Sequence, residues 1–289
     1  MKGVILTNAY SSFPEADYQP FRLKEEFSKL GVTVDILKND FFPVSVQNND
    51  IQNKLSGYDF CIYLDKDKYV LHALQKSKMR VFNSYDAIET CDDKMTTYLA
   101  LAGHGIPLVK TLPGLLCYDK SLPLKQSALD EVEKVLGYPV IVKESYGSLG
   151  KGVYLAKDRE ELNEIAEKLK CVPHLFQQFI SESAGRDVRV IVVGDKVLGA
   201  MLRQGKDDFR SNIGAGGSGS VFSLDQNTSD LALKIARVLD LKYCGIDFLL
   251  TSDGPLVCEV NSNAFFSSFE RVTGINVAKA YAQFILKNI

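Results

Sequence analysis

Residues 1–90 alternate short apolar runs with longer stretches that read as helices. Short buried strands separated by helices of about a dozen residues are typical of βαβ units on a parallel sheet. The predicted strands are 3–7, 32–37, 58–64 and 80–84, and the predicted helices are 18–31 and 68–78. The pattern therefore predicts a small open α/β domain at the start of the chain.

From Asp92 the pattern changes to helices that alternate with closely spaced strands. In one of these helices Ser127 is the expected N-cap and Gly137 the expected stop. Two strands are joined here by a glycine-rich loop, 146–152, with no helix between them. The predicted helices are 92–107, 127–136 and 159–170, and the predicted strands are 139–145, 153–157 and 175–180.

The last third of the chain contains two strand hairpins. The first, 187–203, turns at Gly194-Asp195, a favourable pair for a tight turn, and the second covers 245–261. A glycine-dense loop, 205–220, lies between them. Because Arg210 and Asn212 flank its glycines, a ligand-binding loop is a better interpretation than a linker. Helices are predicted at 229–242 and 275–289.

Composition narrows the class of protein. The chain has 289 residues, of which 46% are hydrophobic and 24% charged, which suits a globular protein of two or three packed units. A net charge of −2 offers no excess of cations for a nucleic-acid backbone. No apolar run reaches the length of a membrane span or of a signal-peptide core, and the six cysteines are scattered. We therefore expect a cytoplasmic protein with reduced thiols and neither nucleic acid nor membrane as partner.

The hairpin 245–261 carries the clearest chemistry. If its turn is centred on Asp253, Asp247 lies opposite Glu259, and Asn261 shares a face with Glu259 and Val257. Two carboxylates side by side on a buried face repel each other unless a counter-charge is present. A divalent cation would supply it, and an all-oxygen ligand set suits Mg²⁺ better than zinc. The alternative, a solvated sheet face, stays open on this hairpin alone.

The loop 146–152 has glycines at Gly147, Gly150 and Gly152 but is not a P-loop, because it joins two strands rather than opening a helix. Such a hairpin can cover phosphates with its backbone N–H groups, although for this loop taken alone a plain surface hairpin is the favoured interpretation. Lys143 ends the strand before the loop, and Lys94 begins a helix. Each lysine can hold a phosphate or simply extend into solvent.

Taken in order, these segments resemble the ATP-grasp ligases, most closely the RimK-like branch of ribosomal-protein glutamate ligases and lysine-biosynthesis ligases. The resemblance covers nearly the whole chain. The segments that carry it are NSYDAIETCDDK, VKESYGSLGKGV, LFQQFI, GRDVRVIVVGDKV, DDFRSN, GIDFL and CEVNSN. It implies an α/β fold, α+β in its C-terminal part, with an N-terminal domain (1–90), a central ATP-grasp subdomain with the phosphate loop (91–175) and a C-terminal subdomain with the metal site (176–289).

The resemblance also implies roles for individual residues. Lys94 and Lys143 would bind ATP phosphates under the 147–152 loop, which includes Ser148. The backbone of Gln178, Phe179 and Ile180 would hold adenine, Asp187 would face the ribose, and Asn212 would belong to the nucleotide site. Arg203 and Arg210 would act at the transferred phosphate, and Asp247, Glu259 and Asn261 would hold Mg²⁺, with two ions expected and Mn²⁺ acceptable.

Three departures from the family pattern concern the substrate pocket. Gln178 stands where Glu is common, Ala215 stands where glutamate ligases often carry Arg, and no proline-glycine follows Asn261. The segment TNAYSSF after the first strand either helps to build the acceptor pocket or is a surface connection. The acceptor pocket is therefore less defined by the sequence than the ATP site.

The implied activity is an ATP- and Mg²⁺-dependent ligation of a carboxylate to an amine through an acyl phosphate, with release of ADP and phosphate. Its substrates would be an amino acid or a similar small molecule, with a protein or peptide tail as a further option, and relatives suggest a homodimer or homotetramer. Two alternatives stay open: a kinase acting on a small-molecule alcohol, and a nucleotide-binding sensor without turnover.

Overall fold

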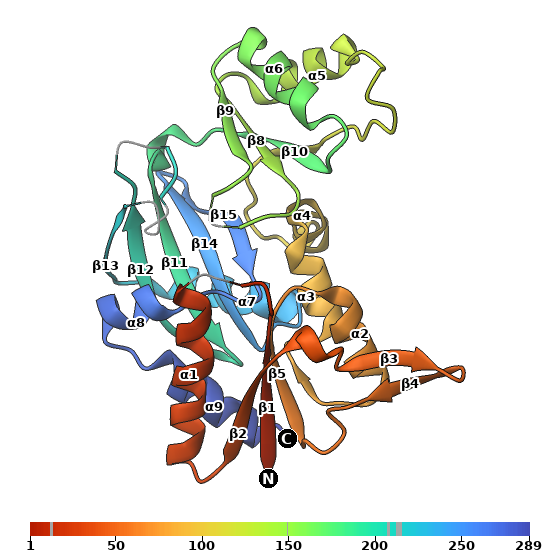
Figure 1. The fold of residues 1–289 in the computed structure, drawn as a ribbon. Helices are drawn as coiled ribbons and strands as arrows, with labels where there is room; N and C mark the ends of the chain where they lie inside the picture. The colour runs from red at the N-terminus through yellow and green to blue at the C-terminus, as the bar shows by residue number, and fades with distance from the viewer. Residues whose placement is uncertain (12–13, 149, 207–208, 212–215) are drawn as a thin grey trace.

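The computed structural model describes the whole chain except residues 12–13, 149, 207–208 and 212–215. The three larger of the four sheets among the described residues follow one another along the molecule, with the N-terminal sheet at one end and the central sheet at the other (Figure 1). The C-terminal five-stranded sheet lies between them. Among the described residues no helix is both long and apolar enough to span a membrane, and all six cysteines are free thiols.

The N-terminal sheet is parallel, as the alternation of strands and helices predicts. Residues Val4, Ile5 and Leu6 of its first strand are completely buried, because helices cover both faces of the sheet. The hairpin β3–β4 was not predicted; its strands are half exposed, and its turn, Asn48-Asn49, has positive φ at both residues. The elements are β1 (Lys2–Thr7), α1 (Pro14–Lys29), β2 (Thr33–Lys38), η1 (Asn39–Phe41), β3 (Val44–Gln47), β4 (Asp50–Asn53), β5 (Phe60–Leu64), α2 (Lys68–Lys76) and β6 (Val81–Phe82).

The central sheet is antiparallel, with strand order β7-β10-β8-β9. Gly137 ends helix α5 (Gln126–Leu136) with φ +66°, as predicted. The prediction that Ser127 is the N-cap of this helix is wrong, because the helix already begins at Gln126. The predicted helix 92–107 is interrupted at Asp93, whose carboxylate accepts the N–H groups of the following turn. The elements are α3 (Tyr85–Asp92), α4 (Lys94–Leu101), β7 (Thr111–Pro113), α5 (Gln126–Leu136), β8 (Val140–Glu144), β9 (Val153–Ala156), α6 (Arg159–Leu169) and β10 (His174–Gln178).

The C-terminal sheet is antiparallel, with order β13-β12-β11-β14-β15. Both predicted hairpins are present, as β11–β12 and β14–β15. The elements are η2 (Ser181–Ser183), β11 (Arg186–Val193), β12 (Lys196–Gln204), β13 (Ser218–Phe222), α7 (Gln226–Val238), β14 (Tyr243–Thr251), β15 (Gly254–Asn261), α8 (Ser267–Thr273) and α9 (Val277–Lys287).

The two faces of strand β11 pack against different helices. Its residues Val188, Val190 and Val192 pack in the apolar cluster that includes α7. On the opposite face, Ile191 and Val193 pack in a second cluster with α9. Side chains alternate along a strand, so the face of Ile191 also carries charged residues nearer the start of β11. One face of the strand is therefore apolar at one end and polar at the end next to the central sheet.

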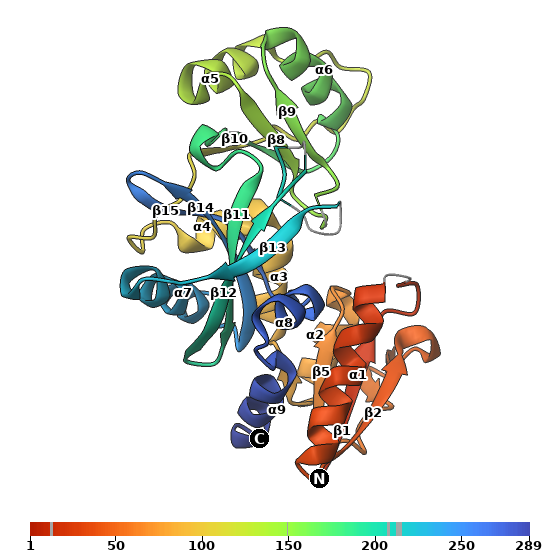
Figure 2. The ribbon, with the colours of Figure 1, turned by 90° about the vertical axis from the view of Figure 1, so that its left-hand side faces the viewer.

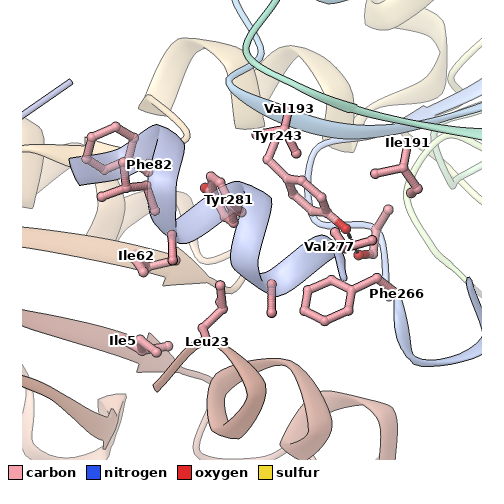
Figure 3. Packing of buried hydrophobic residues seen from close by; sticks show 14 of the residues in the cluster. Ile5, Leu23, Ile62, Phe82, Ile191, Val193, Tyr243, Phe266, Val277 and Tyr281 are labelled. Carbon is pink, nitrogen blue, oxygen red and sulfur yellow. Dashed lines mark hydrogen bonds between the residues drawn. The ribbon is translucent and has the colours of Figure 1, made fainter. Parts of the chain in front are cut away.

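Helix α9 joins the first and last parts of the chain. Figure 3 shows Val277 and Tyr281 of α9 between Ile5 and Ile62 of the N-terminal sheet on one side and residues of β11 and β14 on the other. The second view of the ribbon shows α9 beside α1 (Figure 2). The N-terminal sheet and the C-terminal sheet thus share one core. The division of the chain at residues 90 and 175 stays a prediction, and β10 runs across the second of these boundaries.

Asn83, directly after β6, ties the N-terminal sheet to the C-terminal one. Its Nδ2 donates to the carbonyls of Tyr243 (2.8 Å) and Ser262 (2.9 Å), and its Oδ1 accepts from the N–H groups of Lys242 (2.6 Å) and Tyr243 (3.1 Å). The side chain is only 2% exposed.

We expect Asn83→Ala to lower the free energy of unfolding by about 3 kcal/mol or more, because it leaves several buried backbone groups without partners. Urea unfolding followed by circular dichroism measures this loss. Asn227→Ala, at an exposed position of α7, is the control and should change stability by less than about 0.5 kcal/mol. A loss below about 1 kcal/mol in Asn83→Ala would show that water replaces these contacts.

Candidate functional site

A cavity of about 460 Å³ lies between the central sheet and the C-terminal sheet. Ile141 and Val153 line it from the central sheet, and the carboxyl edge of the N-terminal sheet forms a further side. The predicted site residues that line it are Lys94, Lys143, Gly147, Ser148, Gly150, Gln178, Phe179, Ile180, Asp187, Arg203, Arg210, Asp247, Glu259 and Asn261. Gly152 is not part of the lining, and Asn212 and Ala215 lie outside the described residues.

The predicted pairing of Asp247 with Glu259 is confirmed, although the hairpin is built differently from the expectation. Thr251 pairs with Gly254, so the turn is centred between Ser252 and Asp253 rather than on Asp253. A β-bulge at Cys258 then shifts the register by one residue and brings Glu259 opposite Asp247.

The bulge also changes the face on which neighbouring residues lie. Cys258 lines the cavity together with Glu259, whereas Val257 and Val260 are buried in the cluster with α7. The prediction that Val257 shares a face with Glu259 is therefore wrong, because alternation is interrupted where two consecutive residues occupy one position. Asn261 nevertheless lines the cavity, as predicted.

Buried ion pairs form the floor of the cavity. Arg203 donates two hydrogen bonds to Asp187, at 2.7 and 2.6 Å, and approaches Asp247 Oδ2 at 2.8 Å. Arg189 donates to both oxygens of the same Asp247 carboxylate, through Nε at 2.7 Å and Nη2 at 2.6 Å. These four residues are cross-strand neighbours on β11, β12 and β14. The floor is thus a row of alternating charges, Arg189, Asp247, Arg203 and Asp187.

Arg189 was not among the predicted site residues. A signal for it exists in the sequence, because Asp187 and Arg189 are two residues apart in a strand and must share a face. The contact predicted between Asp187 and the ribose stays a prediction. In this structure both oxygens of Asp187 accept from Arg203, and the hydroxyl of Ser211 donates to one of them.

The two arginines decide the ionisation of Asp247. Burial disfavours its charged form, but Arg189 and Arg203 outweigh that effect and hold the pKa of the carboxyl below its usual value. Asp187 shares only one of these arginines, and burial raises its pKa. Asp247 is therefore the firmly ionised carboxylate of the row.

The carboxylates and the amide on β14 and β15 fit a hard divalent cation. Oδ1 of Asp247 accepts one hydrogen bond from the protein and keeps a lone pair free. Glu259 is 31% exposed, and its Oε1 is 3.9 Å from Lys94 Nζ. Among the described residues the buried Nδ2 of Asn261 has no partner; this atom is a donor, so the amide would bind a metal through its Oδ1. Two carboxylate groups and one amide match the oxygen ligands that Mg²⁺ prefers.

The glycine loop is held at its base by two cations. Lys94 Nζ donates to the carbonyl of Gly147 (3.1 Å), and Arg210 Nη1 donates to that of Gly150 (3.0 Å). Burial lowers the pKa of Lys94. Lys143 lies on β8, the strand before the loop, and its Nζ is 3.7 Å from Sγ of Cys258 on β15. Gly152 packs closely against Glu144 at the end of the loop, since a Cβ at Gly152 would lie 2.7 Å from Cδ of Glu144.

The predicted hinge, 178–180, begins at the last residue of β10. The backbone N–H of Gln178 is bonded to the carbonyl of Lys110 at 2.9 Å, which fixes the start of the segment. Ile141, Val153 and Leu249 line the same cavity from the two facing sheets. Apolar side chains on both sides of a cavity suit a flat ring such as a nucleobase.

The N-terminal sheet contributes a loop that the sequence left open between two interpretations. Thr7, Asn8, Tyr10 and Ser11 line the cavity, so the start of TNAYSSF is part of the site. Its conformation depends on Asp65, which also lines the cavity and whose carboxylate accepts the side-chain N–H groups of Asn8 and Asn39 at 3.0–3.2 Å. Ser12 and Phe13 lie outside the described residues.

Comparison with known proteins gives the following relatives. The sequence profile of the RimK-like ATP-grasp domain matches residues 91–285. Beta-citrylglutamate synthase B of Danio rerio is 40% identical over 77% of this chain and 54% of its own length. A probable alpha-L-glutamate ligase of Maridesulfovibrio salexigens is 36% identical over 71% of this chain and 67% of its own length. The chain thus spans about half the length of the first of these curated relatives.

A RimK-domain ATP-grasp protein from Sphaerobacter thermophilus has the same fold. Its crystal structure superposes with a TM-score of 0.72 over 98% of this chain and 99% of its own, at 22% sequence identity. At this identity the likeness concerns the fold alone, and it confirms the expected α/β class.

Proposed function

Because the chain belongs to the RimK-like ATP-grasp family, we propose that it is an ATP- and Mg²⁺-dependent ligase that joins a carboxylic acid to an amine. The observation that carries this proposal is the cavity between the two sheets. It gathers Lys94, Lys143, Arg203, Asp247 and Glu259 beside an apolar slot. Cations that suit phosphates and carboxylates that suit a metal therefore lie next to apolar side chains that suit a nucleobase.

The reaction has two steps. An oxygen of the acid attacks the γ-phosphorus of ATP, the bond to the bridging oxygen breaks, and the products are an acyl phosphate and ADP. The amine then attacks the acyl carbon, phosphate leaves, and the proton lost by the amine ends on phosphate. Neither step needs a nucleophilic side chain, so the protein contributes position and charge.

The site residues divide this work. Lys94 and Lys143 neutralise phosphate oxygens, and the loop with Gly147, Ser148 and Gly150 covers them. Arg203 is held in place by Asp187 and stabilises the transferred phosphoryl group, while Arg210 binds it from the loop side. Asp247, Glu259 and Asn261 would hold Mg²⁺, which, when bound, neutralises phosphate charge.

We propose L-glutamate as the amine and a small carboxylic acid as its partner. Glutamate occurs in the names of both curated relatives, the beta-citrylglutamate synthase and the probable alpha-L-glutamate ligase. Further points stay predictions: two metal ions, use of Mn²⁺, a peptide tail as an alternative acceptor, a homodimer or homotetramer, and a cytoplasmic location. The roles of Gln178–Ile180 at adenine, of Asp187 at ribose and of Gly152 and Asn212 also stay predictions.

Trapping with hydroxylamine tests the proposal. The protein is incubated with Mg²⁺, ATP, pooled carboxylic acids and hydroxylamine, and hydroxamates are detected by mass spectrometry. We expect a hydroxamate of one acid, formed together with ADP, because hydroxylamine captures acyl phosphates. ADP release that yields a phosphorylated alcohol and no hydroxamate would favour the kinase, and ATP binding without any turnover would favour the sensor.

A further inference from the structure

The two ends of the cavity differ in their hydrogen-bonding character. Near the glycine loop and the floor, the lining includes the carboxylates of Asp187, Asp247 and Glu259 together with five cations, namely Lys94, Lys143, Arg189, Arg203 and Arg210. Where the cavity meets the N-terminal sheet, Asp65 and the amides of Asn8 and Asn263 line it. Asn263 belongs to the segment CEVNSN, and the reaction described above gives it no role.

Asn263 presents an acceptor that nothing in the described part of the protein satisfies. Its Oδ1 is buried and has no hydrogen-bond partner. Leaving a buried polar atom unpaired costs about 1–3 kcal/mol, so an unpaired atom in a residue that lines a cavity points to a ligand that supplies the partner.

The backbone on both sides of Asn263 is fixed. The carbonyl of Ser262 accepts from Asn83 Nδ2 at 2.9 Å. The carbonyl of Ala264 accepts from Gln19 Nε2 at 2.7 Å and from the hydroxyl of Tyr243 at 2.5 Å. Ala264 also packs against Gly245, where an added Cβ would lie only 2.6 Å from its own Cβ. The position of Asn263 is therefore built into the fold.

The chemistry of an unpartnered oxygen selects among the reactants. Phosphates and carboxylates carry acceptors, which such an oxygen repels, whereas an amino group carries N–H donors. Asn263 follows the proposed metal ligand Asn261 by two residues, whereas the hinge proposed for adenine begins on β10 of the central sheet. The negative charge of Asp65 at the same end also favours a cationic amine.

On the basis of the proposed ligase function, we infer that Asn263 accepts an N–H of the attacking amine and orients its nitrogen toward the acyl carbon. The amine it serves is that of an amino acid. Lys66 also lines the cavity beside Asp65, and its Nζ pairs with Asp92 Oδ1 at 2.7 Å, so it would share that ion pair when it binds the carboxylate of a zwitterionic substrate. Asn263 is thus a specificity-determining residue of the second step and has no part in the first.

Two variants separate this role from a structural one. Asn263→Leu removes the acceptor at nearly constant size, and Asn263→Asp keeps it. Each is assayed with Mg²⁺, ATP and pooled carboxylic acids, once with hydroxylamine and once with pooled proteinogenic L-amino acids. Hydroxylamine is small and present at high concentration, so it reports on acyl-phosphate formation without the amine site.

We expect the wild type to form an amide with an amino acid, and both variants to form hydroxamate at wild-type rates. The KM for that amino acid should rise at least about tenfold in Asn263→Leu and change less than about threefold in Asn263→Asp. An unchanged KM in Asn263→Leu, equal losses in both variants, lost hydroxamate formation, or a wild type that forms hydroxamate but no amide would each overturn the inference. A wild type that forms no hydroxamate would overturn the proposed function, and the inference with it.

Discussion

Replacing Glu259 with glutamine is expected to lower kcat at least about a hundredfold to a thousandfold, while the protein stays folded. The change keeps the size of the side chain but removes a charge next to Asp247, where we propose the metal. It costs little stability, because Glu259 is partly exposed and its ion pair with Lys94 is long, at 3.9 Å. ADP release under the best substrate conditions and thermal unfolding measure the two effects.

The matched control is Asp253→Asn, which removes the same charge from the turn of the same hairpin, at an exposed position. It should leave both kcat and the melting temperature nearly unchanged. If Glu259→Gln kept more than about a tenth of wild-type kcat, the metal site assigned to β15 would be wrong.

Arg203→Met is expected to remove activity and to lower the free energy of unfolding by about 3–5 kcal/mol, because it leaves the buried Asp187 without its ion-pair partner. Asp247 keeps Arg189 and should tolerate the change. Chemical denaturation and the ADP assay provide the two readouts.

The double variant Asp187→Leu/Arg203→Met separates these two effects. Replacing both members of a buried ion pair with apolar residues often restores stability, so most of the loss should be recovered. Activity should stay absent, since the cation that stabilises the phosphoryl group is still missing. An active double variant would refute the role of Arg203, and one as unstable as Arg203→Met would refute the pairing argument.

The sequence predicts best what depends on local pattern. The alternation in residues 1–90 predicts the parallel sheet, because strands buried on both faces are apolar throughout. The hairpins at Gly194-Asp195 and near Asp253 follow from turn residues. Helix α8 and strand β13 were missed, since both are short and partly exposed and have no clear period.

The prediction that Asp247 pairs with Glu259 in the hairpin β14–β15 was right because two errors cancelled each other. The turn centre was placed half a residue too late, and the bulge at Cys258 was not foreseen. A bulge depends on packing on both faces of a sheet, which a single strand does not reveal. The faces of Val257 and Cys258 were therefore mistaken, although Asp247 and Glu259 were paired correctly.

Contacts between distant parts of the chain could not be predicted from the sequence. Asn83 bonds to Tyr243 and Ser262, and Arg189 joins Asp247, across separations that no local pattern encodes. The same holds for Asn263, whose unpaired oxygen becomes visible only when its surroundings are built. The sequence thus indicated much of the proposed site but not the residues that hold it in place.

The path of oxygen in the reaction tests the central claim most directly. The acid identified by hydroxylamine trapping is labelled with ¹⁸O in its carboxylate and supplied with ATP, Mg²⁺ and the amine, and the released phosphate is examined by mass spectrometry. An acyl phosphate requires that one labelled oxygen pass from the acid to phosphate, and this is the result we predict. Phosphate without label, formed together with the amide, would contradict the proposed reaction.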